Sequence, residues 1–101
     1  MYKVLIIEDE KPASEWLLQL ILKFDAHIKV LAVVDSVSSA TDWFQQNPSP
    51  DLVFMDIQLA DGLSFEIFER VKVPCPVIFT TAYEEYAIKA FKVNSIDYLL
   101  K

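Results

Sequence analysis

Five short apolar runs recur along this chain at nearly even intervals, and this spacing is the strongest constraint on its fold. The runs begin near Lys3, Ile28, Leu52, Val77 and Ile96. Each gap has room for one helix, and strands that alternate with helices form a parallel sheet with helices on its faces. The sequence therefore predicts an α/β fold in a single domain of 101 residues.

The strand predicted at 52–56 is the best defined of the five. Its four apolar residues stand between the carboxylates of Asp51 and Asp56. A short, uninterrupted apolar run is typical of a strand that is buried on both faces. Asp56, at the end of the run, is therefore predicted to emerge at the carboxyl edge of the sheet.

Helical periodicity fills the first gap. Pro12 is well placed at a helix start, and apolar residues then recur at helical spacing at Ala13, Leu17, Leu20, Ile21 and Phe24. Leu18 and Leu22 lie off this stripe. The helix is therefore apolar over more of its circumference than a simple surface helix needs, and something besides the sheet is expected to cover it.

The later gaps also predict helices. The strand at 28–34 is expected at a sheet edge, and Ser36 is expected to cap a helix that ends before Asn47 and turns four residues to the sheet, namely Val37, Ala40, Thr41 and Phe44. Asp61 and Gly62 indicate a turn. The next helix has a buried line of Leu63, Ile67 and Val71, and a further amphipathic helix is predicted over 83–91.

Composition argues against several functional classes. The net charge is −6, which disfavours a nucleic-acid groove or contact with an anionic membrane. A single glycine, Gly62, cannot supply a phosphate-binding P-loop or a dinucleotide fingerprint. The single Cys75 cannot form an internal disulfide, and neither a leader nor a membrane-length apolar run is recognisable. A cytoplasmic location is therefore expected.

Acidic and hydroxyl side chains follow three of the predicted strands. Glu8 and Asp9 follow the first, Asp56 ends the third, and Thr81 follows the fourth. Clustered carboxylates repel one another unless a cation neutralises them. Carboxylate oxygens suit Mg²⁺, which shares its remaining positions with water and phosphate oxygens. The pattern predicts an Mg²⁺ site at which Asp56 becomes a nucleophile toward a phosphoryl group.

Taken together, these residues resemble the receiver domain of two-component response regulators. The matching pieces are Glu8-Asp9, Asp56, Thr81-Ala82 and the run from Tyr98 to Lys101. Each piece is common alone, but four pieces in register with the strand and helix spacing are specific. The stretch from Phe79 to Ala87, followed by Ala90-Phe91, resembles most the receivers that precede a LytTR-type DNA-binding domain.

The resemblance implies a flavodoxin-like fold, a doubly wound five-stranded parallel sheet with strand order 2-1-3-4-5. It implies that Asp56 accepts a phosphoryl group from a sensor histidine kinase in an Mg²⁺-dependent reaction. Asp9 and Asp56 then bind the metal directly, Glu8 holds a metal-bound water, and the backbone carbonyl of Gln58 is a further ligand.

The resemblance also assigns roles at the remaining strand ends. Thr81 hydrogen-bonds the phosphoryl group, Lys101 pairs with it, and Tyr98 is a switch that turns inward when Thr81 moves. The implied partners are the kinase and a second copy of the chain, which meets the first through the helix at 83–91 and the strand at 96–100. The implied output is transcription regulation through a LytTR-type domain absent from this sequence.

Two departures from the family pattern stand out. Ala60 occupies a position in the loop after Asp56 where a proline is common, so a looser loop is expected. The family also continues through a fifth helix that packs beside the first, whereas this sequence stops at Lys101. We therefore expect residues 1–101 to be a C-terminally truncated receiver that leaves Leu18, Leu22 and part of one sheet face uncovered.

Two other functional hypotheses are alternatives to a switch controlled by phosphorylation. The first is a degenerate receiver that acts as a binding module independent of phosphorylation. The second is a phosphohydrolase of the haloacid dehalogenase type, which also uses an aspartate after an apolar strand. That family needs another aspartate two residues on, and this chain has Gln58 there.

Overall fold

A computed structural model describes residues 2–81 and 97–100, giving the backbone path alone at Thr81 and at 97–100. The helix predicted at 83–91 and the residue Lys101 lie outside this range. The elements along the chain are β1 (Lys3–Ile7), α1 (Lys11–Phe24), β2 (Lys29–Val34), α2 (Val37–Gln46), β3 (Leu52–Asp56), β4 (Gln58–Leu59), β5 (Gly62–Leu63), α3 (Phe65–Arg70), β6 (Val77–Thr81) and β7 (Asp97–Leu100).

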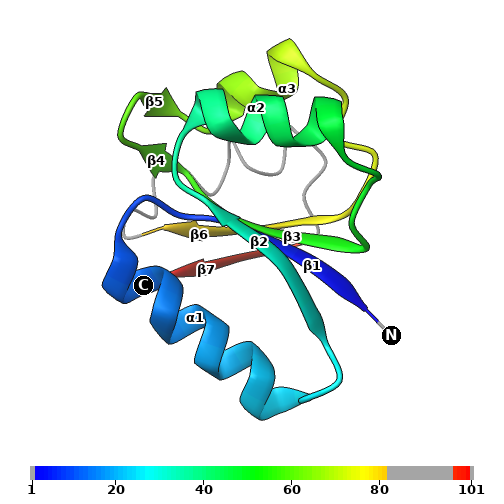
Figure 1. Ribbon diagram of the computed structural model, residues 1–101. Coiled ribbons are helices and arrows are strands. Elements are labelled where there is room, and N and C mark those ends of the chain that lie inside the picture. Colours follow the sequence, from blue (N-terminus) through cyan, green and yellow to red (C-terminus); the bar gives the residue numbers. More distant parts are fainter. Residues whose placement is uncertain (1, 82–96, 101) are drawn as a thin grey trace.

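Five of the strands form one parallel sheet in the order β2-β1-β3-β6-β7. Counting only these strands along the chain, this is the predicted flavodoxin-like order 2-1-3-4-5, with β2 at one edge. Figure 1 shows α1 on one face of the sheet and α2 and α3 on the other. The central pair, β1 and β3, is the point from which the chain winds in opposite directions, where ligands bind in sheets of this kind.

The strand register aligns the carboxyl ends. One row of paired residues crosses four strands, namely Ile7, Met55, Phe79 and Tyr98. The next residues along are therefore Glu8 after β1, Asp56 at the end of β3 and Thr80 in β6. The register places the ends of four strands at one edge, as the sequence predicted.

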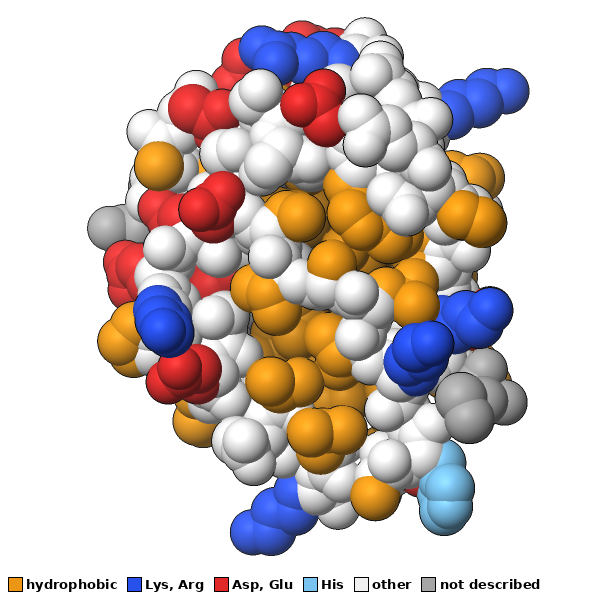
Figure 2. All heavy atoms as spheres, viewed as in Figure 1, with side chains coloured by type: hydrophobic (Ala, Val, Ile, Leu, Met, Phe, Trp, Pro, Cys, Tyr) orange, Lys and Arg blue, Asp and Glu red, His pale blue; other side chains and the backbone are white. Residues whose placement is uncertain are grey.

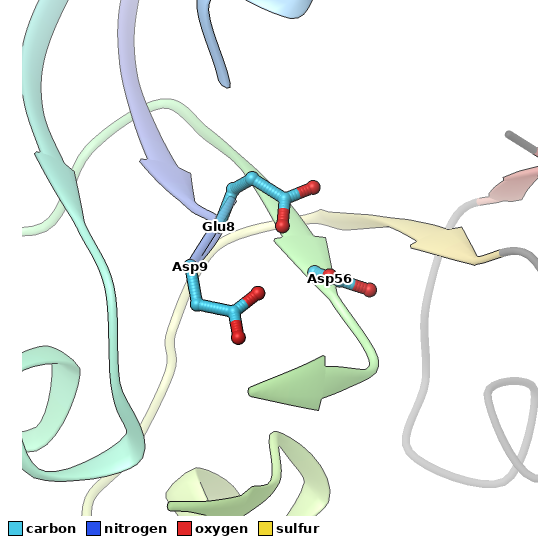
Figure 3. A group of neighbouring side chains, drawn as sticks. All are labelled: Glu8, Asp9 and Asp56. Atoms are coloured by element: carbon cyan, nitrogen blue, oxygen red, sulfur yellow. The ribbon is translucent and has the colours of Figure 1, made fainter. Parts of the chain in front are cut away.

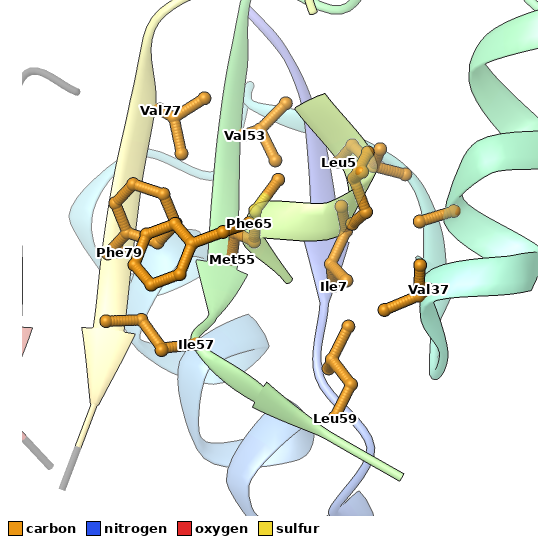
Figure 4. Close-up of a cluster of buried hydrophobic side chains, with 12 residues drawn as sticks. Leu5, Ile7, Val37, Val53, Met55, Ile57, Leu59, Phe65, Val77 and Phe79 are labelled. Carbon is orange, nitrogen blue, oxygen red and sulfur yellow. The ribbon is translucent and has the colours of Figure 1, made fainter. Parts of the chain in front are cut away.

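Alternation along the buried strands divides the core in two. Leu5 and Ile7 face the larger cluster, whereas Val4 and Ile6 face a smaller one beneath α1, because successive strand residues point to opposite faces. Figure 4 shows the larger cluster, in which strand side chains pack against α2 and α3. Its buried members are Leu5, Ile7, Val37, Ala40, Val53, Met55, Ile57, Leu59, Phe65, Ile67, Val77 and Phe79.

Helix α1 covers its face of the sheet less completely than its sequence suggests. Leu17 and Ile21 are buried, as predicted, but Leu20 is 46% exposed and Phe24 is 87% exposed. The predicted stripe is therefore wrong at these two positions, because only a narrow line of the helix meets the sheet. Leu18 and Leu22, expected to be uncovered, are half-buried, and Leu18 packs against the smaller cluster.

Helix α2 follows the prediction. Ser36 caps it, with its side chain accepting the Ser39 N–H at 2.9 Å while the Ser39 hydroxyl accepts the Ser36 N–H at 3.1 Å. Val37, Ala40 and Thr41 are buried, and the helix ends before Asn47. Phe44 is partly buried against the larger cluster.

The following segment differs from the prediction. Helix α3 spans only Phe65–Arg70, so Leu63 and Val71 flank it, and Phe65 joins Ile67 as its buried pair. The residues before it instead form an antiparallel hairpin, in which Gln58 pairs with Leu63 and Leu59 with Gly62. Gly62 has φ 146°, a left-handed conformation that favours glycine. Leu63, which the helical pattern assigns to the helix, therefore lies in the hairpin, and the helix begins later, at Phe65.

Candidate functional site

Glu8 and Asp9 leave the end of β1 and lead into α1. The Glu8 amide donates to the carbonyl of Val34 at 2.9 Å, which extends the ladder between β1 and β2 by one residue. The Glu8 side chain is only 4% exposed, and its Oε2 accepts the Glu10 amide at 3.2 Å. Asp9 is more exposed than Glu8. The Glu8 carboxylate is thus buried at the end of the strand, while the Asp9 carboxylate is accessible to solvent.

Asp56 ends β3 and is 7% exposed. Its Oδ1 accepts the Gln58 amide at 3.4 Å. The intervening Ile57 is fully buried and donates its N–H to the carbonyl of Thr80 on the neighbouring strand at 3.2 Å. These contacts fix both the backbone that carries the carboxylate and the first residues of the loop that follows.

The carboxylates of Glu8, Asp9 and Asp56 converge at the carboxyl edge of the sheet (Figure 3). One oxygen from each lies within 4.8 Å of the others. Three acids this close repel one another, and a divalent cation relieves the repulsion. Two or three carboxylate oxygens with open space for water are a donor set that fits Mg²⁺. The described residues therefore bring together the acidic part of the predicted site.

The remaining predicted residues are placed in part. Asp56 pairs with Thr80, so Thr81 lies one residue farther along β6, where its backbone pairs with Leu100 of β7. Tyr98 lies in β7 opposite Phe79. Lys101 is outside the described residues. The strand register thus brings the backbone of Thr81 to the same edge as the acids.

The surface around the site is acidic. Figure 2 shows Asp and Glu side chains gathered on the side of the molecule where the strands end, and apolar side chains over the middle of the face along β2. Val33, on that edge strand, is 45% exposed. An acidic rim attracts cations from solution, which suits a metal site.

Asp61 is a residue whose role the sequence did not reveal. The sequence predicts a turn at Asp61, and in the structure its carboxylate also accepts hydrogen bonds from two amides at the start of α2, from Val37 at 2.7 Å and from Ser38 at 3.1 Å. The Val37 hydrogen bond is the main reason that the pKa of Asp61 is lowered. Aspartate is a favoured capping residue, but a partner more than twenty positions away cannot be read from local pattern.

Comparison with known proteins agrees with this geometry. The profile of the response regulator receiver domain matches residues 4–101. Two curated relatives carry the name sensory transduction protein LytT. The one from Bacillus anthracis is 38% identical over 104 residues, covering 100% of this chain and 42% of the relative. The one from Enterococcus faecalis is 40% identical over 102 residues, covering 97% of this chain and 41% of the relative. The chain therefore spans about two-fifths of these relatives.

A solved structure of a response regulatory domain has a similar fold. The response regulatory domain of protein mrkE from Klebsiella pneumoniae superposes with a TM-score of 0.81 at 30% sequence identity, covering 98% of this chain and 82% of that one. The profile match extends over nearly the whole sequence, and the sheet has the strand order that the resemblance implies. This chain belongs to the family of response regulator receiver domains.

Proposed function

We propose that this receiver accepts a phosphoryl group on Asp56 from a histidine kinase, in a reaction that requires Mg²⁺. The observation that carries the proposal is the convergence of Glu8, Asp9 and Asp56, whose oxygens lie within 4.8 Å of one another at the carboxyl edge of the sheet. Asp9 and Asp56 would bind the metal directly, Glu8 would hold one of its waters, and the Gln58 carbonyl would complete the protein ligands.

The proposed chemistry is a phosphoryl transfer between two side chains. A carboxylate oxygen of Asp56 forms a bond to phosphorus while the bond from phosphorus to the kinase's histidine nitrogen breaks, and the imidazole leaves with the electron pair. Bound Mg²⁺ supplies neutralisation of the phosphoryl oxygens. The surrounding backbone positions the carboxylate, because Asp56 accepts from the Gln58 amide and Ile57 donates to Thr80.

Thr81, Lys101 and Tyr98 complete the proposed switch. Thr81 would donate a hydrogen bond to the phosphoryl group, Lys101 would pair with its charge, and Tyr98 would respond to movement of Thr81. The register supports this grouping, since Thr81 pairs with Leu100, the residue that precedes Lys101. The proposed response is a changed surface over 83–91 and β7, through which two copies would associate.

The proposal extends to the whole protein of which such a receiver is part. The relatives named sensory transduction protein LytT are more than twice the length of this chain. We propose that the phosphorylated receiver controls a LytTR-type DNA-binding domain and so regulates transcription in the cytoplasm. Among the described residues, no helix is long and apolar enough to span a membrane.

The direct test is phosphorylation by a small phosphodonor. The protein is incubated with acetyl phosphate and Mg²⁺, and its intact mass is recorded. We expect one added phosphoryl group, lost when Mg²⁺ is chelated and absent in Asp56→Asn, because the amide cannot act as the nucleophile.

Asp51→Asn is the matched control. Asp51 precedes the same strand at its other end, where it is exposed and accepts the Lys3 amide at 2.7 Å. It should be phosphorylated like the wild type. Undiminished labelling of Asp56→Asn would defeat the proposal. Absence of both labelling and Mg²⁺ binding in the wild type would favour a phosphorylation-independent binding module.

A further inference from the structure

The N-terminus of α2 is capped by two different parts of the chain. Ser36 and Ser39 satisfy each other's backbone amides within the helix start. The two remaining amides of the first turn, those of Val37 and Ser38, donate to Asp61 at 2.7 and 3.1 Å. A helix start leaves such amides without partners in the helix itself, and its positive end favours a carboxylate. Asp61 thus forms a bridge between α2 and the segment after β3.

This bridge holds the β4–β5 hairpin, the segment that follows β3. Asp61 lies at the turn of the β4–β5 hairpin, whose strands are two residues each. At its base, the Ser64 amide donates to the carbonyl of Ile57 at 2.8 Å, and Leu59 is buried in the core. Ala60, the residue before Asp61, has no ring to restrict its φ angle. The two hydrogen bonds of Asp61 join the tip of the hairpin to the first turn of α2.

The hairpin begins at Gln58, two residues after Asp56. The backbone position of Gln58 is set on one side by its amide, which donates to Asp56 at 3.4 Å, and on the other by its pairing with Leu63 across the hairpin. A shift of the hairpin relative to α2 would displace the Gln58 carbonyl relative to the carboxylates. Groups that orient metal ligands strongly affect metal affinity even though they do not touch the metal.

We propose that Asp61 is a positioning residue for the Mg²⁺ site, which it serves by tying the β4–β5 hairpin to the first turn of α2. The inference rests on the proposed function, in which the Gln58 carbonyl is a metal ligand. Beyond that function, it links the affinity of the Mg²⁺ site to the hydrogen bonds between Asp61 and α2. Because coupling between two sites is reciprocal, bound Mg²⁺ should also stabilise the bridge.

The test measures Mg²⁺ binding by calorimetry under conditions where every variant is folded. Asp61→Ala should raise the dissociation constant on the order of tenfold. Asp61→Asn should have an intermediate effect, because its single amide oxygen can accept one of the two hydrogen bonds. An unchanged dissociation constant in Asp61→Ala would overturn this inference while leaving the proposed function intact, whereas a wild type that binds no Mg²⁺ would overturn both.

Two control variants separate positioning from other effects. Ser36→Ala removes a cap from the same helix but leaves the bridge, and it should bind Mg²⁺ like the wild type. Glu66→Gln removes a negative charge beside the hairpin, since its carboxylate lies against Gly62, and it should also leave binding unchanged. Weakening by Glu66→Gln as large as that by Asp61→Ala would assign the effect to charge and overturn the inference.

Amide hydrogen exchange gives a readout that needs no variant. In the wild type, saturating Mg²⁺ should slow amide exchange at Val37 and Ser38. The ratio of the exchange rates without and with Mg²⁺ should be comparable to the ratio of the Mg²⁺ dissociation constants of Asp61→Ala and the wild type. The Ala40 amide, which donates to the Ser36 carbonyl within the helix at 3.0 Å, reports on α2 as a whole. Equal slowing at all three amides, or none at Val37 and Ser38, would contradict a specific bridge.

Discussion

Identical residues in this chain have different chemistry according to which end of a strand they occupy. Asp51 and Asp56 bracket the same strand, yet Asp51 is exposed and binds the Lys3 amide, whereas Asp56 is 7% exposed and lies beside two other acids. The difference follows from the parallel sheet, because all its carboxyl ends meet at one edge. At the scale of the residue, position in the sheet determines which aspartate can share a cation.

A prediction at this scale concerns Asp61 and pH. Its pKa is lowered chiefly by the Val37 amide, so the folded state favours the carboxylate more than the unfolded state does. The stabilisation is therefore fully present above the unfolded-state pKa and is lost as pH falls through the folded-state pKa. The gap in unfolding free energy between wild type and Asp61→Ala should be constant above about pH 5 and shrink toward pH 3.

Urea unfolding at a series of pH values measures this gap. Asp42→Ala removes an exposed acid later in the same helix and serves as the control for the loss of a negative charge. A gap for Asp61→Ala that widens on acidification would contradict the assigned hydrogen bonds.

At the scale of the element, β6 connects the edge of the sheet beside Asp56 to the larger core cluster. Phe79 in its middle is fully buried, and its ring lies 5.3 Å from that of Phe65 and 6.1 Å from that of Phe68. The two residues after it, Thr80 and Thr81, carry the strand to the edge beside Asp56. These ring contacts, together with the fully buried Ile67, attach the short helix α3 to the sheet.

Phe79→Ala should therefore be strongly destabilising. Removal of a buried aromatic side chain leaves a cavity, and such substitutions typically cost about 3–5 kcal/mol of unfolding free energy. Chemical denaturation followed by circular dichroism measures the change. Val33→Ala, on the exposed edge strand β2, should cost less than about 1 kcal/mol. A cost below that level for Phe79→Ala would show that α3 does not depend on this packing.

At the scale of the whole molecule, the described helices cover one face of the sheet only partly. A groove of about 380 Å³ lies between α1 and the sheet, and its lining is entirely apolar, with contributions from Tyr2, Val4, Leu17, Leu20, Ile21, Phe24, Ile28, Leu52 and Phe54. The other face has α2 and α3 above the larger core cluster. Among the side chains of α1 that line this groove, Phe24 and Leu20 are the most exposed, whereas Leu18 and Leu22, which were expected to be uncovered, are half-buried.

The groove should bind a hydrophobic dye. We expect anilinonaphthalene sulfonate fluorescence to rise on addition of the folded protein and to fall in Phe24→Ser and Leu20→Gln, because exposed apolar patches are where such ligands gather. Phe24 is 87% exposed and Leu20 is 46% exposed, so the unfolding free energy should change by less than about 1 kcal/mol in each variant. Val33→Ser, exposed but outside the groove, is the control. Equal loss of dye binding in Val33→Ser would place the dye elsewhere.

Much of the fold could be predicted from local pattern. The apolar runs, the Ser36 cap and the acids at the strand ends all depend on residues close together in sequence, where steric and hydrogen-bonding preferences act directly. Predictions failed where two elements compete for the same residues. Leu63 fits a helical line but lies in β5. Predictions also failed where a helix meets the sheet along a narrow line, which leaves Phe24 87% exposed although it fits the buried stripe.

The sequence by itself determined which residues could form a strand, which could end one, and that several carboxylates stood at such ends. Only the tertiary structure decided that Glu8, Asp9 and Asp56 share a space within 4.8 Å, and that Asp61 reaches the start of α2. The physical reason is that distances between segments far apart in the chain depend on strand order and register. Those are fixed by how the whole core packs, and no single segment carries that information.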